Sequence, residues 1–373
     1  MSLPKEIESG IEELAAISRI FGSNDEYVLA GGGNTSWKNE KYLFVKRSGV
    51  GLRGITADGF VGMDRDKLAA IWQKEYPRTS AEREAEALAD LMAAKLPGNE
   101  DKRPSVETLL HDLFPYAFVI HTHPALVNGV TCAIEGRNFV EEELESVWVP
   151  VVDPGYLLAL EARKKLFQYQ DSGSEFPKIV FLQNHGIFVA ADTTQEIEQI
   201  YKEIFKAIDS RLHRDPAEDL TLLDGRVRDE VLSAAKEAFA VNDAVGFTNA
   251  DLVEYCTDEK SFLPLSLSFT PDHIVYAGHK PLYVKNLSEL SSGMMKFIRN
   301  EGVPPKIIAI KDAGVFALGN SLEDAERAMA LFLDGVKVAV YAGSFGGANF
   351  MPERAINFIR NWEVENYRAS IKT

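Results

Sequence analysis

The stretch FVIHTHPALVNG, residues 118–129, is an apolar run that ends in two histidines and a proline. The apolar residues predict a buried strand, and Pro124 predicts its end, because proline has no amide hydrogen for a sheet. Side chains two residues apart in a strand point to the same face, so His121 and His123 project together. Two such imidazoles can reach one cation, but a pair of hydrogen-bonded core histidines has the same spacing. From this pair alone, both interpretations stay open.

A third histidine favours the metal. His185 lies between two apolar runs in KIVFLQNHGIFVAAD, residues 178–192, and Gly186 after it lets the backbone turn sharply. Three neutral imidazoles and one open position are typical of a catalytic zinc site. We therefore predict that His121, His123 and His185 bind zinc, with another divalent metal as the alternative. The remaining histidines lie in helical or charged segments, where we expect solvated surface or structural roles: His111, His213, His273 and His279.

The composition limits the class of protein. The chain has 373 residues, which is long enough for two domains, and its formal net charge of -16 disfavours nucleic-acid binding. Cys132 and Cys256 are far apart and form no disulfide framework, which fits a reducing compartment. The N-terminus has no signal-peptide pattern, and no apolar run approaches the roughly 20 residues of a membrane span. We expect a cytoplasmic protein with no nucleic-acid or membrane partner.

Local patterns predict a mixture of helices and short strands. Helices are predicted over residues 5–21, 79–96, 105–114 and 193–212, a strand, glycine loop and strand over 27–49 with a hairpin tip at 39–40, and a pair of strands on either side of His185. Thr193 followed by Glu196 forms a capping box at the start of the last of these helices. The irregular alternation indicates a layered, mixed α/β domain and not a regular doubly wound one.

Two segments of the chain are similar to each other. The 22 residues from Pro177 align without a gap to those from Pro305, sharing Pro-Lys-Ile, a central Gly-x-Phe, and a Thr or Ser cap with an acid three residues later. Ala313 stands in the second segment where the first has His185. We predict a metal-binding catalytic domain over residues 1–235 and a second, smaller α/β domain over 236–373, a degenerate metal-free repeat. Chance similarity between two strand-turn-strand-helix units is the alternative.

The glycine loop AGGGNTSWK, residues 30–38, is a candidate anion site. Its three glycines allow backbone amides to point inward, and Asn34, Thr35 and Ser36 add side-chain donors for a phosphate or carboxylate. A plain tight turn is the alternative. A dinucleotide-binding loop does not fit, because Ser36 replaces the third glycine of that motif and no helix follows.

Glu107 precedes the histidine strand in RPSVETLLHDLFPYAFVIHTHP, residues 103–124. A carboxylate beside a cation could serve as a general base. A glutamate in the first turn of a helix also stabilises the helix dipole, so the position by itself leaves both roles open.

The motifs GGGNTS, VKRSG, PSVET, HTHP and NHG occur in this order over residues 31–186. In this combination and at these separations, the chain resembles the class II aldolase/adducin family of sugar-phosphate aldolases and epimerases. Within that family it is most similar to the aldolase portion of bifunctional rhamnulose-1-phosphate aldolase/alcohol dehydrogenase proteins. The resemblance is specific over about residues 25–210.

The resemblance implies a three-layer α/β/α fold with a mostly antiparallel central sheet, in a homo-oligomer with a tetramer favoured. It assigns zinc binding to His121, His123 and His185, and acid/base catalysis to Glu107. Contacts to the substrate and its phosphate are assigned to Gly32, Gly33, Asn34, Thr35, Ser48, Gly49 and Ser105.

The expected function is that of a zinc-dependent aldolase. Its substrate would be a small-molecule sugar phosphate, a ketose 1-phosphate of the rhamnulose or fuculose type, cleaved to dihydroxyacetone phosphate and an aldehyde. The alternatives are an epimerase, dehydratase or decarboxylase acting at the same metal site, and a non-catalytic scaffold like the adducin head.

Three departures from the family pattern accompany this expectation. Val151 lies near the place of a family tyrosine, so the second acid/base is unidentified, and Val106 replaces the second of two adjacent serines. No GxGxxG follows a strand in the later half, so we expect the dehydrogenase half to be absent.

Overall fold

The structure is a computed structural model that describes residues 4–171, 173 and 175–362. These residues form two compact units, which we call the first and the second unit. The first unit contains the described residues up to Val127 and Arg137–Ser210, and the second contains Asn128–Gly136 and the described residues from Arg211 onward.

A seven-stranded sheet organises the first unit. Its elements are α1 (Lys5–Gly22), β1 (Asn34–Lys38), β2 (Tyr42–Lys46), β3 (Phe60–Asp64), α2 (Arg65–Ile71), α3 (Ser80–Ala93), α4 (Thr108–Leu113), β4 (Phe118–Thr122), α6 (Gly136–Glu143), β5 (Val147–Val149), α7 (Tyr156–Asp171), β6 (Ile179–Leu182), β7 (Gly186–Ala191) and α8 (Thr194–Asp209). Helix α5 (Ala125–Thr131) begins in the first unit and ends in the second. The strand order is β3-β2-β1-β4-β7-β6-β5. Only β5 and β6 pair in parallel, so the predicted mostly antiparallel sheet is confirmed.

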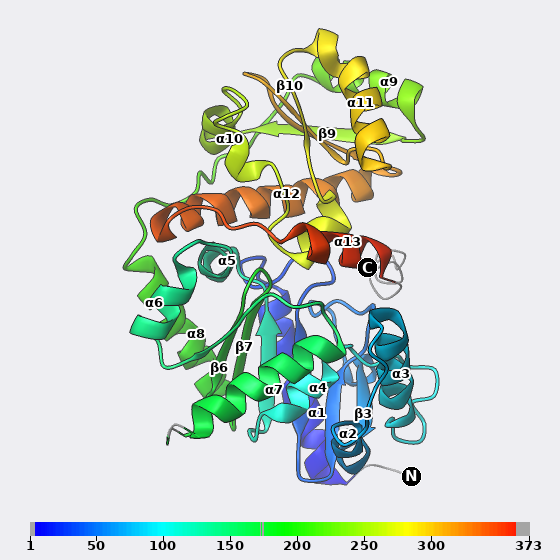
Figure 1. The fold of residues 1–373 in the computed structure, drawn as a ribbon, viewed down its shortest axis with the longest axis vertical. Helices are drawn as coiled ribbons and strands as arrows, with labels where there is room; N and C mark the ends of the chain where they lie inside the picture. Colours follow the sequence, from blue (N-terminus) through cyan, green and yellow to red (C-terminus); the bar gives the residue numbers. More distant parts are fainter. Residues whose placement is uncertain (1–3, 172, 174, 363–373) are drawn as a thin grey trace. The chain divides into compact units, whose positions relative to one another are not determined.

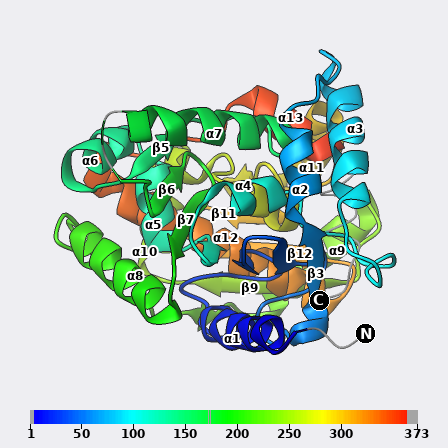
Figure 2. The ribbon, with the colours of Figure 1, turned by 90° about the horizontal axis from the view of Figure 1, so that it is seen from below.

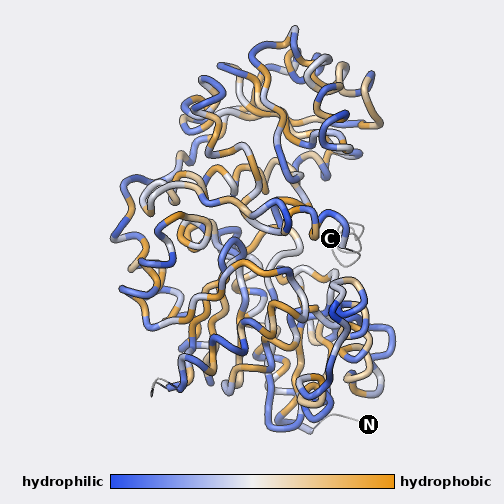
Figure 3. Tube along the Cα trace, viewed as in Figure 1, coloured by the Kyte–Doolittle hydropathy of each residue, from blue (hydrophilic) through white to orange (hydrophobic). Residues whose placement is uncertain are grey.

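Helices cover both faces of this sheet, as the predicted three-layer architecture requires (Figures 1 and 2). Helices α1 and α8 pack on one face, where the hydroxyl groups of Thr122 and Tyr201 are hydrogen bonded at 2.7 Å. Helices α4 and α7 pack on the other face, over a core that includes Leu43, Val119 and Phe188. The strands between these layers are largely apolar (Figure 3).

Strand β4 lies in the middle of the sheet between β1 and β7. All five of its residues are buried, because helices cover both faces, and this explains why its sequence is a continuous apolar run with no polar alternation. His121 pairs with Asn34 on one side and with Phe188 on the other, so these three side chains share the face that carries α4.

The start of β1 differs from the prediction. The stretch 27–30, expected as a strand, lies outside the sheet, and the strand begins only at Asn34, inside the predicted glycine loop. The reason is the backbone: Ala30 has φ 49° and Gly33 has φ 72°, and these left-handed conformations interrupt an extended chain. The predicted hairpin tip after β1 is confirmed, since the amide of Asn39 donates to the carbonyl of Tyr42.

The second unit is built around a five-stranded sheet in the order β10-β11-β12-β9-β8. Its elements are β8 (Thr221–Leu222), α9 (Gly225–Ala238), β9 (Asp243–Thr248), α10 (Ala250–Tyr255), β10 (Leu282–Val284), α11 (Leu290–Glu301), β11 (Ile307–Ile310), β12 (Gly314–Gly319), α12 (Leu322–Ala342) and α13 (Glu353–Asn361). The expected boundary at residues 235/236 falls inside α9. Helix α9 belongs to the second unit, because its residues Val231 and Ala235 are part of the core of that unit.

The two segments that are similar in sequence have the same local structure. In both, two antiparallel strands are followed by a helix that a hydroxyl side chain caps: β6, β7 and α8 in the first unit, β11, β12 and α12 in the second. The tight turns match as well, since Asn184 and Asp312 occupy equivalent positions with φ 56° and 57°. In each sheet the first strand of the pair has a parallel neighbour, β5 or β10, and the second has an antiparallel one, β4 or β9.

Helix α12 is unusually long and apolar. An 18-residue stretch of the segment Leu322–Phe345 has a mean hydropathy of 1.4, and among the described helices this one alone is long and apolar enough to cross a membrane. However, 61% of that stretch is buried inside the structure, where the helix packs on β9 and β12. This burial is typical of a core helix.

Lys38, at the end of β1, is a buried cation in the first unit. Burial lowers the pKa of Lys38 to about 7, although Asp112 nearby opposes the shift. An unfolded lysine titrates near 10.4, so between these values the unfolded chain binds more protons than the folded one and the free energy of unfolding rises with pH. Between pH 7.5 and 9, urea denaturation should show the wild type gaining roughly 1 kcal/mol per pH unit relative to Lys38→Met. If the free energy of unfolding changed with pH in the same way for both proteins, this would contradict the burial of the Lys38 charge.

Candidate metal centre

Three imidazole rings converge in the first unit. His121 lies in β4, His123 follows its end, and His185 lies in the turn between β6 and β7. The Nε2 atoms of His121 and His123 are 2.9 Å apart. One ring nitrogen from each of the three histidines lies within 4.8 Å of the other two, and this is the one group of metal-ligand type found among the described residues. The three histidines predicted from the sequence are therefore brought together.

Backbone geometry places His185 against the other two rings. Asn184, with φ 56°, turns the chain sharply, and the amide of His185 donates to the carbonyl of Leu182. Gly186 then starts β7 in close contact with β4: a Cβ atom there would lie 2.4 Å from the Thr122 carbonyl oxygen and 2.8 Å from Cδ2 of His123. Glycine is required because no side chain fits between the two segments.

The ring of His121 is held in one orientation. Its Nδ1 lies 2.8 Å from the backbone carbonyl oxygen of Ile187, and the ring stacks on Phe188 with 4.1 Å between centroids. A carbonyl oxygen can only accept, so Nδ1 carries the hydrogen. In the neutral ring, Nε2 then presents its lone pair toward the other two histidines, which is how a metal-binding histidine is commonly oriented.

Glu107 completes the cluster. Its Oε1 lies 3.2 Å from Nε2 of His121 and 3.5 Å from Nε2 of His185. Its Oε2 accepts a hydrogen bond of 3.3 Å from the side-chain amide of Asn34. Burial opposes ionisation of Glu107, but positive charge on the imidazoles, first of all on His121 when it is protonated and hydrogen bonded to the carboxylate, holds the pKa of the Glu107 carboxyl well below its usual value.

The donor set fits a divalent cation. Three imidazole nitrogens and one carboxylate oxygen point at the same small volume, and lone pairs at these separations repel one another unless a positive charge lies between them. Nitrogen and oxygen ligands of this kind suit zinc, with three protein nitrogens leaving a position for water or substrate. Glu107 ends next to that position, where a proton could be transferred.

Some of the predicted anion-binding residues lie beside this cluster. A Cβ atom on Gly33 would lie 3.0 Å from the carbonyl oxygen of His121, and Asn34 pairs with His121 across the strands. The hydroxyl of Ser105 accepts a hydrogen bond of 3.2 Å from the amide of Glu107. Gly33 and Asn34 therefore adjoin His121, and Ser105 adjoins Glu107.

Two of the predicted residues are used differently. The side chain of Thr35 points to the opposite face of β1, because neighbours in a strand alternate, and its hydroxyl is hydrogen bonded to Ser18 in α1 at 2.7 Å. The Thr35 side chain is therefore not brought to the histidines. The amide of Gly32 closes a turn on the carbonyl of Leu29 and does not point at an anion.

Ser48 and Gly49 form the loop after β2. Gly49 has φ 83°, which marks a sharp turn, and the amide of Ser48 donates to the carbonyl of Arg103, two residues before Ser105. This hydrogen bond links the loop after β2 to the segment that carries Ser105 and Glu107. The assignment of phosphate contacts to Ser48 and Gly49 stays a prediction.

The other four histidines take both of the expected roles. His111, His273 and His279 are buried in structural positions, and His213 is exposed. His111 is fully buried and its Nδ1 lies 2.8 Å from the hydroxyl of Ser36. The alternation Asn34, Ser36, Lys38 on one face of β1 is a sequence signal that could have linked this face to the candidate site.

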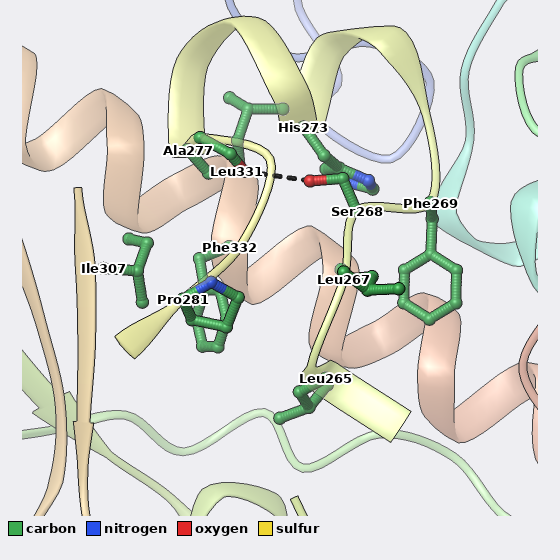
Figure 4. A pocket seen from close by; sticks show the side chains of 12 residues that line it. Leu265, Leu267, Ser268, Phe269, His273, Ala277, Pro281, Ile307, Leu331 and Phe332 are labelled. Atoms are coloured by element: carbon green, nitrogen blue, oxygen red, sulfur yellow. Dashed lines mark hydrogen bonds between the residues drawn. The ribbon is translucent and has the colours of Figure 1, made fainter. Parts of the chain in front are cut away.

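The second unit has other residues at the equivalent positions. The matching turns and strand pairings place Gly246 where the first unit has His121, Thr248 where it has His123, and Ala313 where it has His185. Glycine and alanine have no metal-binding side chain. A cavity in this unit, lined mainly by apolar side chains of residues 265–281 and α12, has a volume of about 30 Å³, too small for a sugar phosphate (Figure 4).

Replacing Gly186 by alanine should disrupt the cluster. The new methyl group would collide with the Thr122 carbonyl and the His123 ring. Because small displacements of its ligands weaken metal binding, we expect the affinity for a divalent metal to fall at least about tenfold. Isothermal titration with zinc would measure this, with Gly54→Ala, which has open space around it and no positive φ, as the control. Equal zinc affinity in Gly186→Ala and wild type would contradict the close approach.

The chain is similar in sequence to proteins of one family. The family described as class II aldolase and adducin N-terminal domain matches residues 12–206, more than half of the chain. A curated relative, the uncharacterized oxidoreductase YuxG of Bacillus subtilis (strain 168), is 24% identical over 422 residues that cover 98% of this chain and 59% of that protein. The chain thus spans about three-fifths of the length of that relative.

Solved structures of similar proteins cover about the first unit. The N-terminal class II aldolase domain of a conserved protein from Thermoplasma acidophilum is 29% identical, covering 54% of this chain and 92% of that one, with a TM-score of 0.45. An L-fuculose 1-phosphate aldolase from Glaciozyma antarctica PI12 is 15% identical, covering 57% and 76%, with a TM-score of 0.35. The match over residues 12–206, which include β1 to β7 and the histidine cluster, establishes that the chain belongs to the class II aldolase and adducin N-terminal domain family.

Proposed function

We propose that this protein is a zinc-dependent aldolase that cleaves a ketose 1-phosphate, of the rhamnulose or fuculose type, into dihydroxyacetone phosphate and an aldehyde. The observation that carries the proposal is the convergence of His121, His123 and His185 with the carboxylate of Glu107, whose Oε1 is 3.2 Å from Nε2 of His121. Membership of the family supports a lyase-like enzyme. Another divalent metal in place of zinc remains the alternative for the cofactor.

The cluster supplies the two kinds of group that the reaction needs. A divalent cation held by the three imidazoles would act as a Lewis acid toward the carbonyl and neighbouring hydroxyl oxygens of the ketose. The protein side chains hold that position fixed, because His121 is oriented by the Ile187 carbonyl and His185 by its tight turn. Fixed ligands contribute to catalysis by holding the reacting atoms in place.

Glu107 is the residue proposed to move a proton. Cleavage breaks the bond between carbons 3 and 4 of the ketose. The hydroxyl on carbon 4 loses its proton as carbon 4 becomes the aldehyde, and carbon 3, which keeps the electron pair, must receive a proton. In the reverse, condensing direction, Glu107 must be ionised to remove that proton, and a divalent cation held by the three imidazoles would favour the carboxylate form. The amide of Asn34 holds the other carboxylate oxygen, so Oε1 is the atom that faces the substrate.

The phosphate is proposed to bind along the glycine loop, Asn34 and Ser105, with the loop of Ser48 and Gly49 beside it. We further propose a cytoplasmic homo-oligomer, with a tetramer favoured, whose partner is the small-molecule sugar phosphate. The net charge of -16 supports the absence of a nucleic-acid partner. The anion must therefore be held by local hydrogen bonds and not by a broad basic surface.

Incubation of the zinc-loaded protein with rhamnulose 1-phosphate and fuculose 1-phosphate, with coupled detection of dihydroxyacetone phosphate, tests the reaction. Glu107→Gln keeps the shape of the side chain but not its basicity, so we expect kcat to fall roughly 10²- to 10⁴-fold with zinc still bound. The control is Glu175→Gln, a change to an exposed glutamate that is not one of the cluster residues. If no ketose phosphate yields dihydroxyacetone phosphate, the aldolase proposal is wrong; an epimeric or dehydrated product would establish the alternative chemistry.

Metal analysis tests the cofactor. Because the second unit has Gly246, Thr248 and Ala313 at the equivalent positions, elemental analysis should find one zinc ion per chain and not two. His185→Ala should release that ion and abolish turnover while the circular dichroism stays unchanged, whereas His213→Ala, at an exposed histidine, should retain both. A protein that takes up no divalent ion after reconstitution would favour the non-catalytic scaffold.

A further inference from the structure

One face of β1 carries three polar side chains that form hydrogen bonds with helix α4 or with its N-cap residue, Glu107. Asn34 donates to the carboxylate of Glu107 at 3.3 Å, Ser36 is hydrogen bonded to Nδ1 of His111 at 2.8 Å, and Nζ of Lys38 donates to the carbonyl of His111 at 2.7 Å. Strand alternation explains why these residues share a face. We call this set of three hydrogen bonds the β1–α4 ladder.

The middle contact of the ladder is fully enclosed. Ser36 and His111 are both 0% exposed, and the His111 ring packs edge-on against Phe188, the residue on which His121 stacks. Burial holds the pKa of His111 well below its usual value, so the ring is neutral. Its Nε2 has no hydrogen-bond partner within the described part of the chain. The bond to Ser36 is therefore the side-chain contact that fixes the rotation of this ring.

Helix α4 depends on such contacts for its position. It has six residues and its N-cap, Glu107, makes no side-chain capping hydrogen bond. A helix of this length has no independent stability, so the surrounding contacts decide where it lies. Because Glu107 is the N-cap residue directly before the helix, a movement of α4 relative to β1 moves the carboxylate relative to His121.

We propose that Ser36 and His111 are positioning residues whose hydrogen bond sets the distance between the Glu107 carboxylate and the three imidazoles. The catalytic consequence rests on the proposed function, while the structural consequence can be measured without turnover. Asn34 touches Glu107 directly, and Lys38 donates to the backbone carbonyl of His111. Ser36 is thus the ladder residue that contacts the side chain of His111, and this bond links β1 to α4 within the buried core.

The chain offers a matched control for Ser36. Ser18 is also a fully buried serine, and its hydroxyl is hydrogen bonded to Thr35 of the same strand at 2.7 Å, but on the opposite face. Ser36→Ala and Ser18→Ala therefore each delete one buried hydroxyl beside β1, and only the first touches α4. We expect similar decreases in melting temperature for both variants.

The activity of the two variants should differ. Ser36→Ala should lower kcat about tenfold or more with little change in KM, because the carboxylate is misplaced while the phosphate contacts remain. Ser18→Ala should stay within about twofold of the wild type. His111→Phe removes the hydrogen bond and keeps the aromatic contact, so it should lower kcat like Ser36→Ala, and the double variant should lose no more than either single one. Equal losses in Ser36→Ala and Ser18→Ala would overturn the proposal.

A second readout needs no substrate. In protein labelled with ¹⁵N at histidine, Ser36→Ala should shift the imidazole resonances of His121 and His185, the two rings next to Glu107, and Ser18→Ala should leave them in place. Unchanged resonances in Ser36→Ala would overturn the positioning role whatever the reaction is. Shifted resonances in a protein that cleaves no ketose phosphate would support the role of the ladder and contradict only the proposed aldolase reaction.

Discussion

The pairing of β4 with β1 and β7 is the constraint on which the candidate site depends. It aligns Asn34, His121 and Phe188 across three neighbouring strands and gives them one face of the sheet. His121 is thereby stacked on Phe188, and Asn34 comes within hydrogen-bonding distance of Glu107. A shift of β4 by one residue in this register would turn His121 to the opposite face, where α1 and α8 pack, away from Asn34 and Phe188.

The site contains polar side chains that are held rigidly and whose burial costs free energy. His121 and its neighbours on β1 are polar side chains in a fully buried strand layer, and each is stabilised by a hydrogen bond to backbone or to another side chain. Burying such groups costs free energy unless they are paired, so a fold that retains them fixes their positions closely. Gly186 and Asn184 add a turn with no room for adjustment. This arrangement is suited to holding a cation whose ligands must stay in place.

The second unit has the same backbone pattern as the first but lacks its histidines. It keeps the strand pair, the left-handed residue in the turn, and the capped helix that follows. At the histidine positions it has small or non-ligating residues, and Phe316 packs where Gly246 leaves space. The same backbone pattern therefore forms without metal ligands, which indicates that apolar burial and not metal binding determines this architecture.

The sequence by itself determined the mixed α/β class, the strand that ends in HTHP, the strand pair around His185 and the helix cap at Thr193, because periodicity, proline, glycine and capping residues act locally. Motif order pointed to the family and to the three histidines. Only the tertiary structure decided that Thr35 faces α1, that residues 27–30 lie outside the sheet, and that His111 is buried beside the candidate site. These features depend on strand register and on contacts between residues as distant as Ser36 and His111, and no local pattern specifies which distant partner a buried polar side chain will meet.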